Sequence, residues 1–90
     1  MAIEGSKLSR VFTDAAVTAT PAAFPNYGGE KFTMQAAFAN TQSVFIGDSA
    51  NQPIELKPGD FLELEFNDSL STLWRKATSG TQTVSIMVFV

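Results

Sequence analysis

The sequence predicts an all-β fold: a single β-sandwich or jelly-roll-like domain of about six to seven strands. Three observations lead to this expectation. Short runs of β-branched and aromatic residues alternate with polar residues, which is the period of a strand with one buried face. Gly, Pro, Asn and Asp interrupt these runs at regular intervals, as they do in sandwiches and barrels. No window repeats apolar residues at helical spacing.

The first part of the chain contains two expected strand-forming runs separated by a loop. The run from roughly Ser9 to Thr18 is expected to form a strand or a pair of strands, and the run from Lys31 to Phe38 forms the next strand. Between them, the Pro- and Gly-rich segment 18–29 is expected to be a loop whose Phe24 and Tyr27 fold back over the edge of the core. The second run has a period-two apolar face made of Phe32, Met34, Ala36 and Phe38.

A Pro-Gly hairpin is the clearest local unit. A short apolar strand, Ser43 to Ile46, precedes it, and Ile54 to Leu56 leads into the turn Lys57-Pro58-Gly59-Asp60. Pro followed by Gly suits the centre of a type II turn, because Pro fixes its φ and Gly accepts a positive φ. The strand Phe61 to Phe66 then alternates apolar residues with Glu63 and Glu65.

The end of the chain is expected to contain two more strands. Asn67-Asp68-Ser69 and Ser79-Gly80 are expected turns, and they bound a strand from Leu73 to Ala77. The last strand, Thr83 to Val90, has one fully apolar face made of Val84, Ile86, Val88 and Val90. Its other face carries Met87 and Phe89, so the strand is either central between layers or covered by another subunit.

Size and composition favour one domain that associates with other chains. Residues 1–90 are expected to form a single domain, with about 1–8 as a flexible N-terminal arm. The chain is 44% hydrophobic and 17% charged and has no Cys, so no disulfide reinforces it. A sandwich of two sheets cannot bury both faces of the last strand, and a second copy of the chain would cover the apolar face that is left exposed. The sequence therefore predicts a homo-oligomer.

The residues needed for common enzyme chemistry are missing. Without His and Cys, the chain cannot form a Ser-His-Asp or Cys-His nucleophile system, and zinc loses its two main ligands. Glu63 and Glu65 are expected on one solvated face rather than in a catalytic pair. The chain is therefore predicted to be no enzyme and to need no cofactor or metal.

Charge and hydropathy exclude two classes of partner. A net charge of −3 with scattered basic residues argues against nucleic acid and anionic membranes. No segment approaches the roughly 18 apolar residues of a membrane span, and the start carries no signal-peptide pattern. The protein is expected to be made as a soluble cytoplasmic product.

Two large aromatic side chains are candidates for contact with a sugar or a protein partner. Tyr27 is expected to pack on the core of its own chain more readily than to bind. For Trp74, beside Arg75-Lys76, burial and a contact role are equally weighted. With Met87 and Phe89, these residues complete the set of candidate partner or subunit contacts.

A pattern over residues 31–90 resembles one found in small tailed-phage virion proteins. It consists of Asn40-x-x-x-Val44-x-Ile46-Gly47, then Leu56-x-Pro58-Gly59-Asp60-x-Leu62-x-Leu64, then Asn67-x-x-Leu70. Proteins of this kind are capsid decoration (cement) subunits or short head fibres. The segment Trp74-Arg75-Lys76 departs from the more apolar strand expected there.

The resemblance implies a β-sandwich or jelly-roll domain, commonly trimeric, bound to the major capsid protein or another virion protein. It also implies that the protein is located in the virion. Two hypotheses stay open at this point. The first is a non-enzymatic virion structural protein that stabilises a phage head lattice. The second is a carbohydrate- or receptor-binding module of the fibre or adhesin type.

Overall fold

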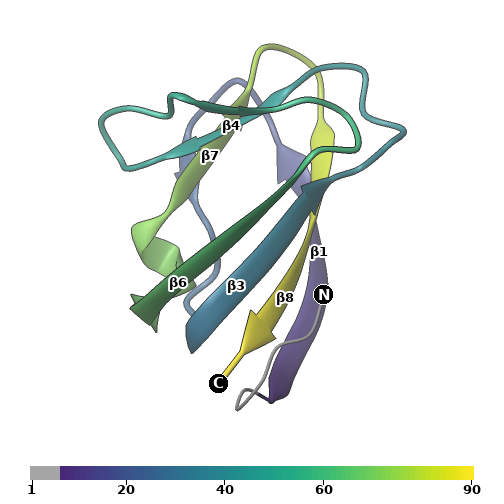
Figure 1. The fold of residues 1–90 in the computed structure, drawn as a ribbon. Coiled ribbons are helices and arrows are strands. Elements are labelled where there is room, and N and C mark those ends of the chain that lie inside the picture. Colours follow the sequence, from purple (N-terminus) through teal and green to yellow (C-terminus); the bar gives the residue numbers. More distant parts are fainter. Residues whose placement is uncertain (1–6) are drawn as a thin grey trace.

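Two four-stranded antiparallel sheets form the fold in the computed structural model, which describes residues 7–90 (Figure 1). Sheet A has the strand order β1-β8-β3-β6, and sheet B has the order β2-β7-β4-β5. The described chain contains these strands: β1 (Leu8–Val17), β2 (Ala22–Ala23), β3 (Gly28–Ala36), β4 (Val44–Gly47), β5 (Ile54–Leu56), β6 (Phe61–Ser69), β7 (Trp74–Ala77) and β8 (Gln82–Phe89).

The strand order is that of a jelly roll. The pairs β4–β5, β3–β6, β2–β7 and β1–β8 are nested about the loop between β4 and β5, so the chain is one antiparallel ribbon wound across two sheets. This confirms the predicted fold class. The described chain has eight strands rather than six or seven, because the expected loop over 18–29 contains the two-residue strand β2.

The core lies between the two sheets. Sheet A contributes alternate residues of its two central strands, as the period-two pattern predicts, and sheet B and the connecting segments close the other side. The fully buried side chains include Phe24, Phe32, Met34, Ile46, Leu70, Val84, Ile86 and Val88. Phe38, which the sequence places on the same face as Met34, lies beyond the end of β3 and is 79% exposed, so that expectation is wrong.

The Pro-Gly turn has the predicted conformation. Gly59 has a φ of +88°, and the Asp60 amide donates to the Lys57 carbonyl over 2.8 Å. The Asp60 carboxylate accepts a hydrogen bond from the Lys57 amide in return, at 2.9 Å. The Gly59 amide also donates to the carbonyl of Ala36, which holds the turn against the end of β3.

One end of the β3–β6 pair, where β3 begins and β6 ends, extends further than the sequence suggests. β6 continues to Ser69, where a turn was expected, because Gly28 and Gly29 at the start of β3 pair with Ser69 and Asp68. Cross-strand pairing here overrides the turn preference of the Asn-Asp-Ser segment. The chain turns one residue later, in the short 3-10 helix Leu70–Thr72, capped by the Ser69 side chain.

The two termini of the described chain lie side by side. The amides of Lys7 and Val90 each donate to the other's carbonyl, and Leu8 pairs with Phe89. Leu8 therefore belongs to β1, and Lys7 is hydrogen-bonded to Val90; the other residues of the expected arm, 1–6, lie outside the described residues. Val90, expected to face the core, is exposed beyond the end of β8. No helix in the described part is long and apolar enough to cross a membrane.

Candidate functional site

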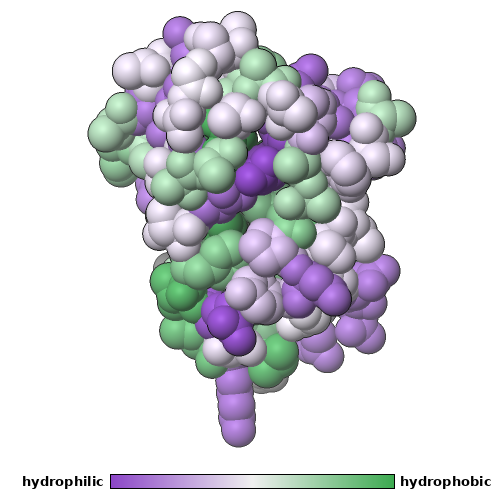
Figure 2. Space-filling view, turned by 180° about the vertical axis from the view of Figure 1, so that it is seen from behind, coloured by the Kyte–Doolittle hydropathy of each residue, from purple (hydrophilic) through white to green (hydrophobic). Residues whose placement is uncertain are grey.

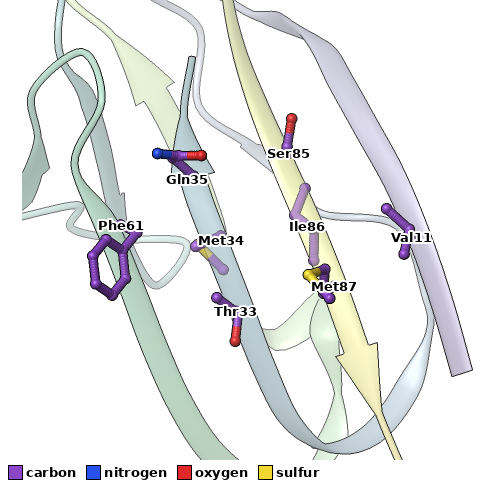
Figure 3. A pocket seen from close by; sticks show the side chains of 8 residues that line it. All are labelled: Val11, Thr33, Met34, Gln35, Phe61, Ser85, Ile86 and Met87. Atoms are coloured by element: carbon purple, nitrogen blue, oxygen red, sulfur yellow. The ribbon is translucent and has the colours of Figure 1, made fainter. Parts of the chain in front are cut away.

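The outer face of sheet A, which points away from sheet B, carries the main candidate surface. In the middle of this face the register places Val11, Met87 and Thr33 side by side on β1, β8 and β3. The next row toward the loops contains Ser85 and Gln35, and Gln35 pairs with Phe61 on β6. Residues directly opposite one another project from the same face, so these side chains form one continuous surface (Figure 3).

A shallow, mainly apolar hollow of about 290 Å³ lies on this face. Val11 and Phe61 stand at opposite sides of it with 61% and 68% of their surface exposed, and Met87 lies between them at 38% (Figure 3). Seen from the opposite side of the molecule, polar and apolar side chains are interspersed (Figure 2). Exposed large apolar side chains grouped in this way are typical of a contact surface.

Charged side chains border the hollow on the β3–β6 side. The Lys31 ammonium lies 2.8 Å from a Glu65 carboxylate oxygen. The hydrogen bond that Lys31 donates to Glu65 raises the pKa of Lys31 above its ordinary value, and the negative charges of Glu65 and Glu63 act in the same direction. Glu63 and Glu65 thus lie on one outward face, as predicted, with a lysine beside them.

The two outward residues of the last strand have different surroundings. Met87 is accessible in the hollow, whereas Phe89 lies between Leu8 and Lys31 and is only 8% exposed. The prediction that this strand is apolar on both faces is therefore correct. Its own chain nevertheless covers Phe89, so only Met87 offers the predicted contact surface.

Tyr27 packs against its own chain. The Arg10 guanidinium lies 4.1 Å from the centre of the Tyr27 ring, and the Phe12 ring meets it edge-on at 5.1 Å. Tyr27 also contacts the hydrophobic core. Packing on the core, which the sequence favours for this residue, is what the structure shows, and the ring is not a free stacking platform.

Trp74 lies on the outer face of sheet B, far from Met87. It pairs with Ala23 on β2 and Gly47 on β4, two small residues that leave room for the half-buried indole. A Cβ at Gly47 would collide with the backbone of the Asn51–Pro53 segment, so this segment crosses the same face beside Trp74. The four candidate residues therefore do not form one site.

A buried ion pair between the two sheets was not predicted. The Arg75 Nε donates to Asp14 Oδ2 at 2.7 Å and its Nη2 to Asp14 Oδ1 at 3.2 Å, with each side chain only 9% exposed. Arg75 alternates with Trp74 and therefore points into the sandwich, where it also approaches the Phe24 ring. The period-two pattern of β7 contained this signal, since it places Arg75 on the same face as Ala77.

The part of the chain that the structure describes has few groupings of charged side chains that could form a chemical site. No three acidic side chains gather there as potential metal ligands. A second, more open hollow of about 460 Å³ lies on the side of sheet B, with Lys76 as its only charged lining residue. No protein-family profile matches the chain, and no curated protein is significantly similar to it.

Proposed function

We propose that this chain is a non-enzymatic structural protein of a tailed-phage virion: a decoration subunit that stabilises the head lattice. It docks on the shell protein through the outer face of sheet A. The hollow between Val11, Met87 and Phe61 is the observation that carries this proposal. Self-association and location in the virion belong to the same proposal.

The form of the hollow favours a protein partner over a small molecule. Small-molecule sites enclose roughly 300–1,000 Å³ and present a few convergent polar groups. The hollow on sheet A is at the lower limit of this range and lies open on the face of the sheet, so it would leave much of a small molecule exposed. An apolar centre bordered by charged residues such as Lys31 and Glu65 is instead the usual pattern of a protein–protein contact.

The fold is compatible with the proposal but does not distinguish it from a sugar-binding module, because jelly rolls occur in both viral capsids and lectins. The resemblance over residues 31–90 supports the virion assignment. The alternative carbohydrate- or receptor-binding module receives less support, because Tyr27 is covered by Arg10 and Trp74 is half-buried.

Co-sedimentation with heads of the phage that carries the gene, stripped of this subunit, tests the proposal. Met87→Glu places a charge in the hollow and is expected to weaken binding at least about tenfold, as for a contact worth 1.4 kcal/mol or more. Ile54→Glu is the matched control, since Ile54 is an exposed apolar residue on the other sheet. Failure of the wild type to sediment with the heads, or equal binding by Met87→Glu, would contradict the proposal.

A further inference from the structure

β1 is a long edge strand whose middle stretch pairs regularly with β8. It lies at the end of sheet A, with β8 on one side and no strand of the described residues 7–90 on the other (Figure 1). Natural edge strands are protected by charged side chains or Pro, by β-bulges and by inward-pointing charged residues, all of which discourage another strand from adding to the sheet. β1 has no Lys, Glu or Pro. Its charged residues, Arg10 and Asp14, project from the inner face with Val88 and Val84, and its register shifts lie outside the stretch from Arg10 to Asp14, so the backbone of that stretch stays regular.

The other edges of the described sheets are protected or short. β6 carries Glu63, Glu65 and Asp68, so that two β6 strands brought together would place like charges close to one another. β2 and β5 have only two and three residues. β1 is therefore the one long edge among the described strands whose outward face carries no charge.

Two independent features of β1 share the same midpoint, Phe12. The pairing with β8 is regular from Arg10 to Asp14 and shifts register on either side of that stretch. These five residues have Phe12 at their centre. The two charges, of opposite sign, also lie two residues before and two residues after Phe12.

We infer that β1 is the contact strand for a second copy of this chain, which pairs antiparallel with Phe12 opposite Phe12 on a two-fold axis. In this register Arg10 of each copy lies opposite Asp14 of the other, and Val11 lies opposite Thr13. In this register each inward residue lies opposite an inward residue, and each outward residue opposite an outward one. The inner and outer faces of the two sheets therefore remain continuous. The eight-stranded sheet that results carries the hollow beside Val11 in both copies.

The charges select this register rather than supplying most of the binding energy. Asp14 already accepts both hydrogen bonds from Arg75, so an approaching Arg10 adds to an ion pair that is satisfied. Centring the pair on Val11 or on Thr13 instead would lose the match of opposite charges. Backbone pairing supplies the attraction, and complementary charges exclude the other registers.

A two-fold contact through one edge closes on itself. The acidic β6 edge stays free in the pair, so that the chains form dimers and not open-ended fibres. The solution mass should thus correspond to an even number of copies, in place of the three that the resemblance implies. This inference does not depend on the identity of any capsid partner.

Cysteine cross-linking tests the register, because the natural chain contains no Cys. Val11→Cys and Thr13→Cys are single variants at exposed positions that should fold normally. Mixing the two under mild oxidation is expected to give a disulfide-linked heterodimer in several-fold excess over either variant alone, since paired strand residues lie within disulfide reach. Asn67→Cys, exposed on the β6 edge, is the control for random collision.

Light scattering on the wild type accompanies this experiment. An even-numbered mass together with the Val11–Thr13 cross-link supports the inference. A trimer, or cross-linking no greater than that of the Asn67→Cys control, overturns it while leaving the proposed function standing. Preferential linkage of Val11→Cys to itself, or of Thr13→Cys to itself, would show that the register is wrong.

Discussion

The buried ion pair between Asp14 and Arg75 predicts a large and strongly coupled effect on stability. Replacing Asp14 by Leu leaves the Arg75 guanidinium inside the sandwich without its counter-charge. Removing one partner of a buried ion pair costs about 3–5 kcal/mol. The free energy of unfolding of a small domain is on the order of 5–10 kcal/mol, so this single change should remove about half of it.

The double variant separates the value of the pair from the penalty of breaking it. Arg75→Met alone strands the Asp14 carboxylate and is expected to destabilise to a similar degree. Asp14→Leu combined with Arg75→Met replaces the pair by apolar side chains, an exchange that is often neutral. We therefore expect the double variant to be more stable than either single variant, with a coupling energy above about 2 kcal/mol.

Urea unfolding followed by tryptophan fluorescence measures these differences. Trp74 is the only tryptophan and lies next to Arg75 in β7, so it reports directly on this region. The slope of the free energy against urea should stay constant among the variants, so that shifts of the midpoint reflect stability. Single-variant losses below about 1 kcal/mol with no coupling are typical of solvated ion pairs and would refute the reasoning.

Three further changes have defined outcomes in the same assay. Gly59→Val should lower the free energy of unfolding by about 1–3 kcal/mol, because it forces a positive φ on a β-branched residue. Gly28→Val is the control, since an added Cβ meets open space there. Equal unfolding midpoints for the two variants would contradict the turn assignment. Gln82→Leu removes a buried amide that makes four hydrogen bonds, and it should lower the free energy of unfolding by about 1–3 kcal/mol. An unchanged unfolding midpoint would mean that water replaces these hydrogen bonds in the variant. The hydrogen bond to Glu65 raises the pKa of Lys31 above 10.5, so the stability that Lys31→Met removes should be fully present below that pH and disappear as the pH rises beyond it. A difference from the wild type that is independent of pH would contradict this.

Features set by local sequence were predictable. The alternation of apolar and polar residues fixed the inward faces of β3 and β8, because successive side chains of a strand point to opposite sides. The Pro58-Gly59 turn followed from the backbone preferences of two residues. Met87 was correctly placed on the outward face of β8 by the same period-two rule.

Features that depend on distant partners were not predictable. The segment Asn67-Asp68-Ser69 has turn-forming residues, yet it continues β6 because Gly28 and Gly29 supply a pairing strand. Phe89 points outward as expected, but it lies between Leu8 and Lys31 on the neighbouring strands and is buried.

The candidate surface itself shows the same limit. Val11 and Phe61 lie 50 positions apart in the sequence, and they flank Met87 only because sheet A has the order β1-β8-β3-β6. Nothing near either residue specifies that order. Period-two alternation can identify an outward residue, but the strands beside it must be known before a surface can be drawn.

The nested pairing of the jelly roll has a consequence for how the chain folds. β4 and β5 are the closest partners in sequence, and β1 and β8 are the most distant. The entropy lost on closing a loop increases with its length. The strand pairs are therefore expected to form in order from β4–β5 outward, with β1 pairing last. Until then the backbone of β8 has a free edge, on which a strand of another chain competes with β1. Chain concentration during this last step should therefore decide between correct folding and the exchange of β1 between molecules.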